Sequence, residues 1–172
     1  MGLTKVFKNI RESSQLGFAG TVLLYKVYIF LKYRMRSDEY YIRKQFKAKL
    51  GYDLDLSKPK TMTEKIQWYK VNYKNPLIVQ CADKYEVRNY VAEVIGDEYL
   101  IPLVFHTTNY KEIIPENLPD FPIVIKANHT SGTTHFVRDK HNVNWKSIQT
   151  DCKWWLQLNY YFLDKEWQYQ NI

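Results

Sequence analysis

The sequence predicts an α+β protein in which helices outnumber short strands. Helix-capping residues and apolar residues at helical spacing recur along the first half of the chain, and short runs rich in β-branched residues follow them. A chain of 172 residues with 45% hydrophobic and 16% aromatic residues can bury a sizeable core, which excludes a wholly disordered protein. The two cysteines, Cys81 and Cys152, are too few for a disulfide scaffold and indicate reduced thiols.

The net charge of +7 comes from the N-terminal part of the chain. Residues 1–50 contain eleven Lys and Arg against three Asp and Glu, whereas residues 51–172 contain fourteen against fifteen. A nucleic-acid-binding domain more often spreads its basic residues over its folded face. We therefore expect no nucleic-acid partner. We also expect two parts, a basic and apolar helical segment over residues 1–45 and a domain over residues 46–172.

Residues 16–31 form an apolar run that is interrupted by Thr21 and Lys26. As a helix this run would be about 24 Å long, short of the hydrocarbon core of about 30 Å. A lysine near its centre would also be costly in lipid. We therefore do not expect a membrane-spanning helix. A signal peptide is not expected either, because basic residues rather than a small-residue cleavage site follow the run.

Two interpretations of the basic segment stay open. It either lies on the anionic inner face of a membrane or packs on the rest of the protein with a solvated basic face. In the first case each cation near the surface contributes about 1 kcal/mol, and the protein is cytoplasmic and peripheral on the inner face of the membrane. The basic residues are Lys5, Lys8, Arg11, Lys26, Lys32, Arg34, Arg36, Arg43, Lys44, Lys47 and Lys49.

Local signals place the helices after this segment. Thr61 and Glu64 have the spacing of a capping box, which opens a helix. Gly51 and Gly96 each follow a helical pattern and are expected to end it, and Asn144 is a plausible cap for the last helix. We expect helices over residues 37–50, 61–71, 87–95 and 145–161, and another that starts at Asn75-Pro76.

Three short apolar runs predict strands over residues 100–105, 121–127 and 135–138. Lys126 lies near the end of the second run, and a loop of Asn, His, Ser, Thr and Gly residues follows it over residues 128–134. Backbone N–H groups and hydroxyls in such a loop can surround phosphate oxygens, and a lysine at its base adds positive charge. The pattern differs from a Walker loop, because the lysine precedes the loop.

Four stretches in a fixed order extend this pattern to most of the chain: KTMTEKIQWYK, NPLIVQCADKYEVRNYV, GDEYLIPLV and FPIVIKANHTSG. Together they resemble the TupA-like branch of the ATP-grasp family, which is linked to teichuronopeptide and other cell-surface polysaccharide biosynthesis. The resemblance runs from about Lys47 to the end of the chain. The expected fold is therefore a helical N-terminal part followed by the N-terminal portion of an ATP-grasp fold, a short, mainly antiparallel sheet with helices.

The resemblance implies where ATP binds. ATP-grasp proteins hold ATP between two α+β subdomains, and one lysine in an Asp-Lys pair contacts the phosphates, which Lys84 matches. A second lysine on the strand before a flexible loop contacts phosphates and adenine, which Lys126 matches. Related loops carry more glycine than this one, so a stiffer loop is expected here. The implied loop contacts are Asn128, His129, Ser131, Gly132, Thr133 and Thr134.

Relatives continue beyond the position of Ile172 into a second subdomain that carries acidic Mg²⁺ ligands. From the resemblance we therefore expect this chain to be an incomplete enzyme that lacks a metal site of its own. It would then need a missing C-terminal subdomain or a partner chain. The family uses Mg²⁺ with ATP, and metal neutralises the charge that develops in phosphate chemistry. We accordingly expect no ligase turnover from the chain alone.

Three functions follow from these patterns. The resemblance implies ATP-dependent ligation of a carboxylate to an amine through an acylphosphate. A glycosyltransferase is the alternative enzyme, because Asp53-Leu54-Asp55 has the form of a metal-binding Asp-x-Asp motif. A non-catalytic accessory chain at the membrane is the third alternative.

Overall fold

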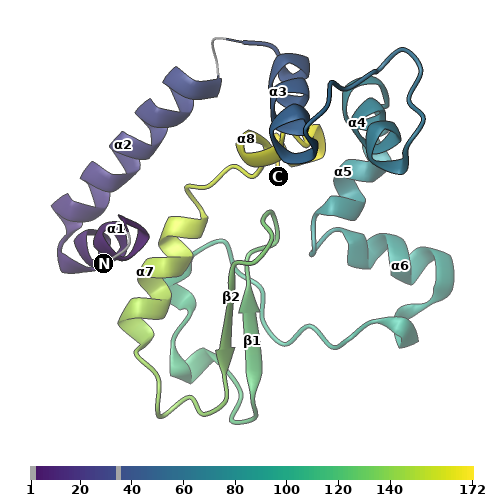
Figure 1. Cartoon of the computed structure of the whole chain (residues 1–172). Coiled ribbons are helices and arrows are strands. Elements are labelled where there is room, and N and C mark those ends of the chain that lie inside the picture. The colour runs from purple at the N-terminus through teal and green to yellow at the C-terminus, as the bar shows by residue number, and fades with distance from the viewer. Residues whose placement is uncertain (1–2, 34–35) are drawn as a thin grey trace.

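The computed structural model describes residues 3–33 and 36–172, so Arg34 of the basic segment lies outside the described residues. Helices and a two-stranded antiparallel sheet confirm the predicted α+β class (Figure 1). Figure 1 shows α1 (Leu3–Ser13) and α2 (Gln15–Tyr33) beside α7 (Trp145–Trp155), with the hairpin next to α7. The remaining helices are α3 (Asp38–Leu50), α4 (Met62–Asn72), α5 (Pro76–Ala82), α6 (Val87–Ile95) and α8 (Tyr161–Asp164).

The predicted caps form hydrogen bonds in the structure. The Thr61 hydroxyl accepts from the Glu64 N–H at 3.2 Å, and the Glu64 carboxylate accepts from the Thr61 N–H at 2.8 Å, which confirms the capping box. Asn75 accepts from the Leu77 N–H at the start of α5, and Asn144 accepts from the Ser147 N–H at the start of α7. These bonds satisfy amide groups that the first turn of each helix leaves free.

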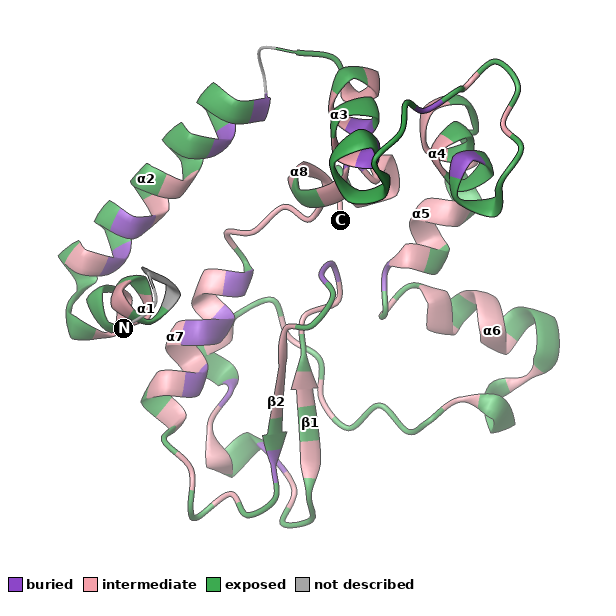
Figure 2. Ribbon diagram, viewed as in Figure 1, coloured by how far each residue is buried: buried purple, intermediate pink, exposed green. Residues whose placement is uncertain are grey.

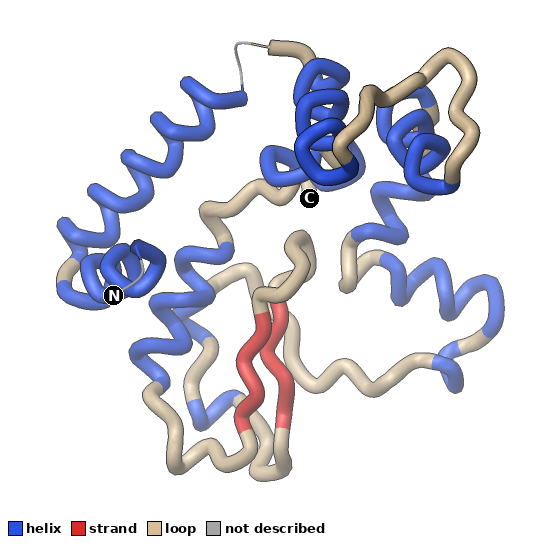
Figure 3. Tube along the Cα trace, viewed as in Figure 1, coloured by secondary structure: helices blue, strands red, loops and turns tan. Residues whose placement is uncertain are grey.

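The sheet consists of β1 (Ile123–Lys126) and β2 (Thr134–Val137), joined by the polar loop (Figure 3). In this register Lys126 lies opposite Thr134 and Ile123 opposite Val137. The strand predicted over residues 100–105 is wrong, because the structure has an extended segment without strand pairing there. Pro102 has no N–H to donate to a ladder, and Ile101 is 83% exposed rather than buried.

The helix predicted over residues 145–161 is also interrupted. It ends at Trp155, and the chain turns before α8 begins at Tyr161. The Asn159 side-chain oxygen Oδ1 accepts from the Tyr161 N–H at 3.1 Å, an Asx turn that competes with a continuous helix. Four short 3-10 helices complete the structure: η1 (Asp97–Tyr99), η2 (Tyr110–Glu112), η3 (Pro115–Asn117) and η4 (Trp167–Tyr169).

Two hydrophobic clusters hold these elements together (Figure 2). The larger cluster joins α7 to the hairpin and to η3, and the smaller one joins α3 to the loop after it. The predicted boundary between residues 45 and 46 falls within α3, and Ile42 and Phe46 on either side of it share the smaller cluster. The division into two parts stays a prediction. The larger cluster contains Ile113, Leu118, Val137, Ile148, Cys152 and Trp155.

Asp151 on α7 connects the N-terminal helices to the hairpin. Its side chain is 10% exposed and meets the Lys8 Nζ at 3.0 Å, the Arg11 guanidinium at 3.6 Å and the His135 Nε2 at 3.3 Å. Burial alone would raise the pKa of Asp151, but the hydrogen bonds from His135 and Lys8 and their charges lower it below its ordinary value. The carboxylate therefore stays charged and holds α1 against α7.

We predict that Asp151→Asn lowers the free energy of unfolding by about 3 kcal/mol, because it leaves the poorly exposed Arg11 without its counter-charge. Urea unfolding followed by circular dichroism measures the change. Asp97→Asn removes an equally charged but exposed carboxylate and is the matched control, expected to change stability little. Equal stability of Asp151→Asn and the wild type would contradict the assignment.

The pH dependence of the free energy of unfolding provides a second test of the Asp151→Asn variant. A carboxylate with a lowered pKa contributes stability above its ordinary pKa of 3.8, and that contribution is lost as the pH falls through the lower folded value. The stability difference between the wild type and Asp151→Asn should thus be constant near neutral pH and shrink below about pH 4. A difference that grows with acid would contradict this account.

Candidate functional site

The candidate site forms where the turn between α5 and α6 meets the hairpin loop (Figure 1). Asp83 is buried at this turn, and its Oδ1 accepts from the backbone N–H groups of Tyr85 at 2.7 Å and Glu86 at 3.2 Å. Its Oδ2 accepts from the Asn128 side-chain amide at 2.8 Å. The carboxylate thus shapes the turn and fastens it to the loop at the same time.

Lys84 is the next residue and is bound to the same loop. Its backbone N–H donates to the Asn128 carbonyl at 3.2 Å, and its ammonium group donates to that carbonyl at 3.2 Å and to the Thr130 carbonyl. Two segments that are more than forty residues apart in sequence are thereby fixed against each other. The lysine reaches the base of the loop, as the Asp-Lys pattern implies.

Lys126 lies at the end of β1, directly before the loop, and is exposed. Its charge acts on Lys84: burial lowers the pKa of Lys84, and the positive charge of Lys126 lowers it further, while Asp83 partly opposes the shift. Lys84 is also hydrogen-bonded to the loop that begins just after Lys126. The two lysines that sequence analysis assigned to phosphate therefore border the same loop.

The inner part of the loop is packed and hydrogen-bonded. His129 is 6% exposed, with Nδ1 at 3.0 Å from the Asn128 amide oxygen and Nε2 at 2.9 Å from the Trp155 carbonyl. Both partners are acceptors, so both contacts are hydrogen bonds when both ring nitrogens carry protons. Thr130 is almost fully buried, and its hydroxyl hydrogen-bonds to that of Thr133. His129 and Thr130 thus support the loop from within.

The tip of the loop faces outward. Ser131 and Gly132 are exposed, and Gly132 has a φ of 79°, in the left-handed region that favours glycine. Thr133 and Thr134 are partly exposed on the return into β2. The loop therefore presents a hydroxyl and backbone groups at its tip, above the two lysines at its base.

An apolar surface adjoins the lysines on the hairpin. Side chains alternate across a strand, so Lys126 and Val124 share one face, while Ile123 and Ile125 face the core with α7. Phe136 pairs with Val124 and is 74% exposed. This face can contact a flat ring, and the lysines beside it can contact an anionic group, a combination that suits a nucleotide.

A protein-family model described as TupA-like ATPgrasp matches residues 64–172. The chain belongs to the TupA-like ATP-grasp family. No match was found among curated proteins or among solved structures. The matched range contains every residue of the candidate site and begins within α4, later than the start near Lys47 that sequence analysis expects.

Membership in the ATP-grasp family implies the use of ATP and Mg²⁺. The lysines and the polar loop fit the phosphates of ATP. Within residues 3–33 and 36–172, no group of three or more His, Cys, Asp or Glu side chains could hold a metal ion.

The Asp-x-Asp motif has a local role in the loop after α3. Leu54 is buried with Ile42 and Phe46, Asp53 pairs with Lys47 at 2.9 Å, and Asp55 accepts from the Ser57 N–H and hydroxyl. Hydrogen bonds from Ser57 lower the pKa of Asp55. Asp53 thus binds a side chain of α3, and Asp55 binds groups of its own loop.

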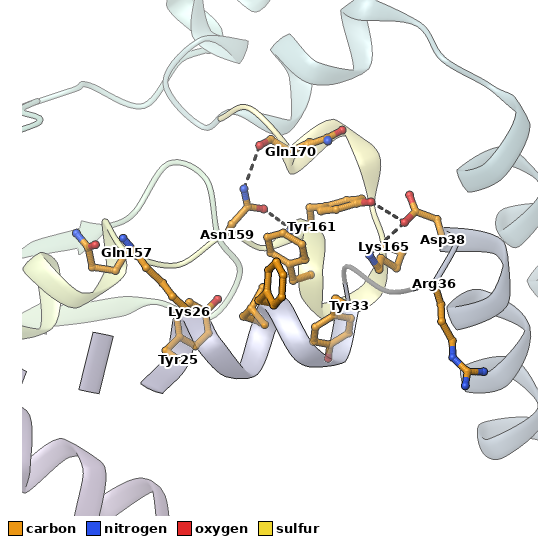
Figure 4. A pocket seen from close by; sticks show the side chains of 13 residues that line it. Tyr25, Lys26, Tyr33, Arg36, Asp38, Gln157, Asn159, Tyr161, Lys165 and Gln170 are labelled. Carbon is orange, nitrogen blue, oxygen red and sulfur yellow. Dashed lines mark hydrogen bonds and ion pairs between the residues drawn. The ribbon is translucent and has the colours of Figure 1, made fainter. Parts of the chain in front are cut away.

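A cavity of about 660 Å³ lies apart from the lysines, between α2, the start of α3 and the C-terminal segment (Figure 4). Lys165 is 2% exposed at its edge, pairs with Asp38 at 3.1 Å and is surrounded by aromatic rings. Burial and the nearby Asp38 raise the pKa of Tyr161, which donates to the same carboxylate. These contacts fasten the C-terminal segment to α3. The four rings around Lys165 belong to Tyr33, Tyr41, Tyr161 and Phe162.

Sequence analysis missed three features of the candidate site. Sequence analysis treats Asp83 only as the neighbour of Lys84 and not as the partner of Asn128, because that bond joins distant segments. It leaves Thr130 out of the implied loop contacts, although the Thr130 carbonyl holds Lys84. The apolar face of Val124 and Phe136 could have been found from strand alternation once the hairpin register was assumed.

We predict that Gly132→Ala lowers the free energy of unfolding by about 1 kcal/mol, because an L side chain is strained at a φ of 79°. Space is not the cause, since a Cβ at this position meets no atom within 4 Å. Gly132→Asn should lose less, because asparagine tolerates left-handed backbone. Urea unfolding of each variant measures the effect.

Gly20→Ala is the matched control for the same change of side chain. Gly20 lies within α2, and a Cβ there also meets no atom within 4 Å, so alanine should stabilise the helix by about 0.5–1 kcal/mol. Opposite signs for the two variants are expected. An increase in stability for Gly132→Ala would contradict the conformational role of Gly132.

Proposed function

We propose that the chain binds the phosphates of ATP at Lys84, Lys126 and the loop between β1 and β2, for an ATP-dependent carboxylate–amine ligation in cell-surface polysaccharide biosynthesis. The observation that carries the proposal is that both lysines border one loop: Lys84 donates to the Asn128 and Thr130 carbonyls, and Lys126 ends the strand before that loop. The lowered pKa of Lys84 agrees with this placement. Membership in the TupA-like ATP-grasp family supports the choice of ATP as the anion.

The charge balance at this position favours an anionic ligand. Two ammonium groups repel each other, and the nearest carboxylate, Asp83, is already bound to two backbone N–H groups and to Asn128. A polyphosphate between the lysines would relieve their repulsion and raise the pKa of Lys84 toward its ordinary value. The site is therefore more stable with a bound polyanion than without one.

The loop and the hairpin face complete the proposed nucleotide site. The Ser131 hydroxyl and the backbone N–H groups at the tip would donate hydrogen bonds to phosphate oxygens. Val124 and Phe136, two residues along the hairpin from Lys126 and Thr134, would pack against the adenine ring. His129 would act through the loop, because its ring contacts Asn128 and the Trp155 carbonyl rather than solvent.

The proposed ligation has two steps. A carboxylate oxygen of one substrate attacks the γ-phosphorus of ATP, and ADP leaves, which forms an acylphosphate. The amine nitrogen of the second substrate then attacks the carbonyl carbon, phosphate leaves, and the nitrogen loses a proton as the amide forms. The residues described here would hold and orient the triphosphate in the first step, where positioning and charge stabilisation provide most of the catalysis.

We predict that Lys126→Ala weakens ATP binding at least about tenfold, because a charge-assisted contact to phosphate contributes roughly 1.5–3 kcal/mol. Calorimetric titration of ATP into the wild type and the variant measures the change. Lys126 is exposed at the end of β1, so the variant should fold normally. Lys58→Ala, which removes an exposed lysine from the loop after α3, controls for the loss of net charge. Equal binding by the wild type and Lys126→Ala would overturn the assignment.

A second variant distinguishes binding of the adenine ring from binding of the phosphates. Phe136→Ala should weaken binding of ATP about tenfold through the loss of ring contact but leave binding of inorganic tripolyphosphate unchanged. Ile101→Ala removes a similarly exposed apolar side chain elsewhere and should leave both ligands unaffected. Equal ATP affinity in Phe136→Ala and the wild type would contradict the placement of the adenine ring on the hairpin face.

A further inference from the structure

Helix α2 carries apolar side chains on its outer side as well as on its packed side, with Lys26 and Lys32 as its exposed cations. Phe18, Thr21, Ile29 and Tyr33 are buried on the inner side. A surface helix of a globular protein normally turns polar residues outward. Here the outward residues are apolar and 46% to 86% exposed (Figure 2): Leu16, Leu23, Leu24, Val27 and Leu31.

Contacts with α7 fix which side of α2 faces outward. The rings of Tyr25 and Trp154 meet edge to face at 5.3 Å, and the Lys153 ammonium lies 4.0 Å from the ring centre of Phe18. Helix α1 is held to α7 through Asp151 and packs on α2. The outward face therefore cannot be buried by rotation of the helix unless these contacts break.

The charges around this face are unbalanced. The three acids within residues 3–33 and 36–50 are all engaged within the protein: Glu12 accepts from the Ser147 hydroxyl, Asp38 pairs with Lys165, and Glu39 pairs with Arg43. Five cations of the same segment have no carboxylate within ion-pair distance among residues 3–33 and 36–172. They are Lys5, Lys26, Lys32, Arg36 and Lys44.

We propose that the outward face of α2 docks on an anionic lipid bilayer, with the helix lying in the plane of the interface. An apolar face flanked by uncompensated cations matches such a surface in both polarity and charge. The ammonium group of Lys32 lies near the ring of Tyr28, an exposed amphipathic side chain that suits the boundary between lipid and water. This docking is independent of the proposed ATP binding.

Two other uses of the face fit the structure less well. A second copy docked through the same face would bring the cations of both chains together. By length and hydropathy alone α2 could also cross a membrane. The core helix of a soluble protein and a signal sequence meet the same two criteria. Crossing would place Lys26 in lipid and would separate Phe18 and Tyr25 from α7.

The test is sedimentation of the full chain with phosphatidylcholine vesicles that contain or lack phosphatidylserine, at low and high salt. We expect binding to the anionic vesicles at low salt, weaker binding at high salt because surface charge is screened, and little binding to neutral vesicles. Lys26→Glu with Lys32→Glu should lose at least tenfold in binding to anionic vesicles, since each lysine near the surface contributes about fivefold.

The apolar contribution needs a matched pair of triple variants. Leu23→Ser, Leu24→Ser and Leu31→Ser together should reduce binding at least tenfold, and circular dichroism should show that the fold is kept, because these side chains are exposed. Ile101→Ser, Leu103→Ser and Val104→Ser remove a similarly exposed apolar run elsewhere and should bind like the wild type. Equal loss in both triple variants would overturn the proposal.

Three further outcomes would also overturn it. One is the absence of binding to anionic vesicles at low salt. Another is a dimer in analytical ultracentrifugation that the α2 triple variant abolishes, which would assign the face to a second copy. The third is protection of α1 or of the hairpin from protease in sealed vesicles, which would indicate a spanning helix.

Discussion

The hydrogen bonds between the Asp83-Lys84 turn and the hairpin loop determine where the charges of the candidate site lie. Asp83 holds Asn128, and Lys84 holds the carbonyls of Asn128 and Thr130, so the loop cannot move without the turn. The same contacts bring Lys84 under the influence of Lys126. Two repelling cations are tolerated there because carbonyl dipoles solvate one of them and the other is exposed to water. Phosphate binding would use an arrangement that the fold already maintains.

Local chemistry made most of the elements predictable, and distant contacts explain what was missed. The capping box at Thr61 and Glu64 and the cap at Asn144 depend on neighbours within a few residues, so the sequence alone identifies them. The run at residues 100–105 has strand-forming residues, but a strand needs a partner that its own sequence does not specify. Spacing alone could not bring Lys84 to Lys126; family resemblance suggested both residues, and the structure shows how the loop joins them.

The two interpretations of the N-terminal segment describe two sides of one helix. The inner side of α2 packs on α7, and the ion pairs of Asp151 anchor α1 beside it, which accounts for part of the basic charge. The outer side remains apolar and flanked by unpaired cations, a combination that internal packing does not explain. The packed side therefore sets the orientation, and the exposed side is available for the proposed docking.

The most direct test of the central claim is the pKa of Lys84, measured by NMR titration of the labelled ammonium group in the wild type and in Lys126→Met. The account predicts a pKa below the ordinary lysine value of 10.5 in the wild type, a rise when Lys126 loses its charge, and a rise when ATP is added to the wild type. A pKa that stays at its ordinary value in all three samples would contradict the account, because the two lysines would then not share one anion site.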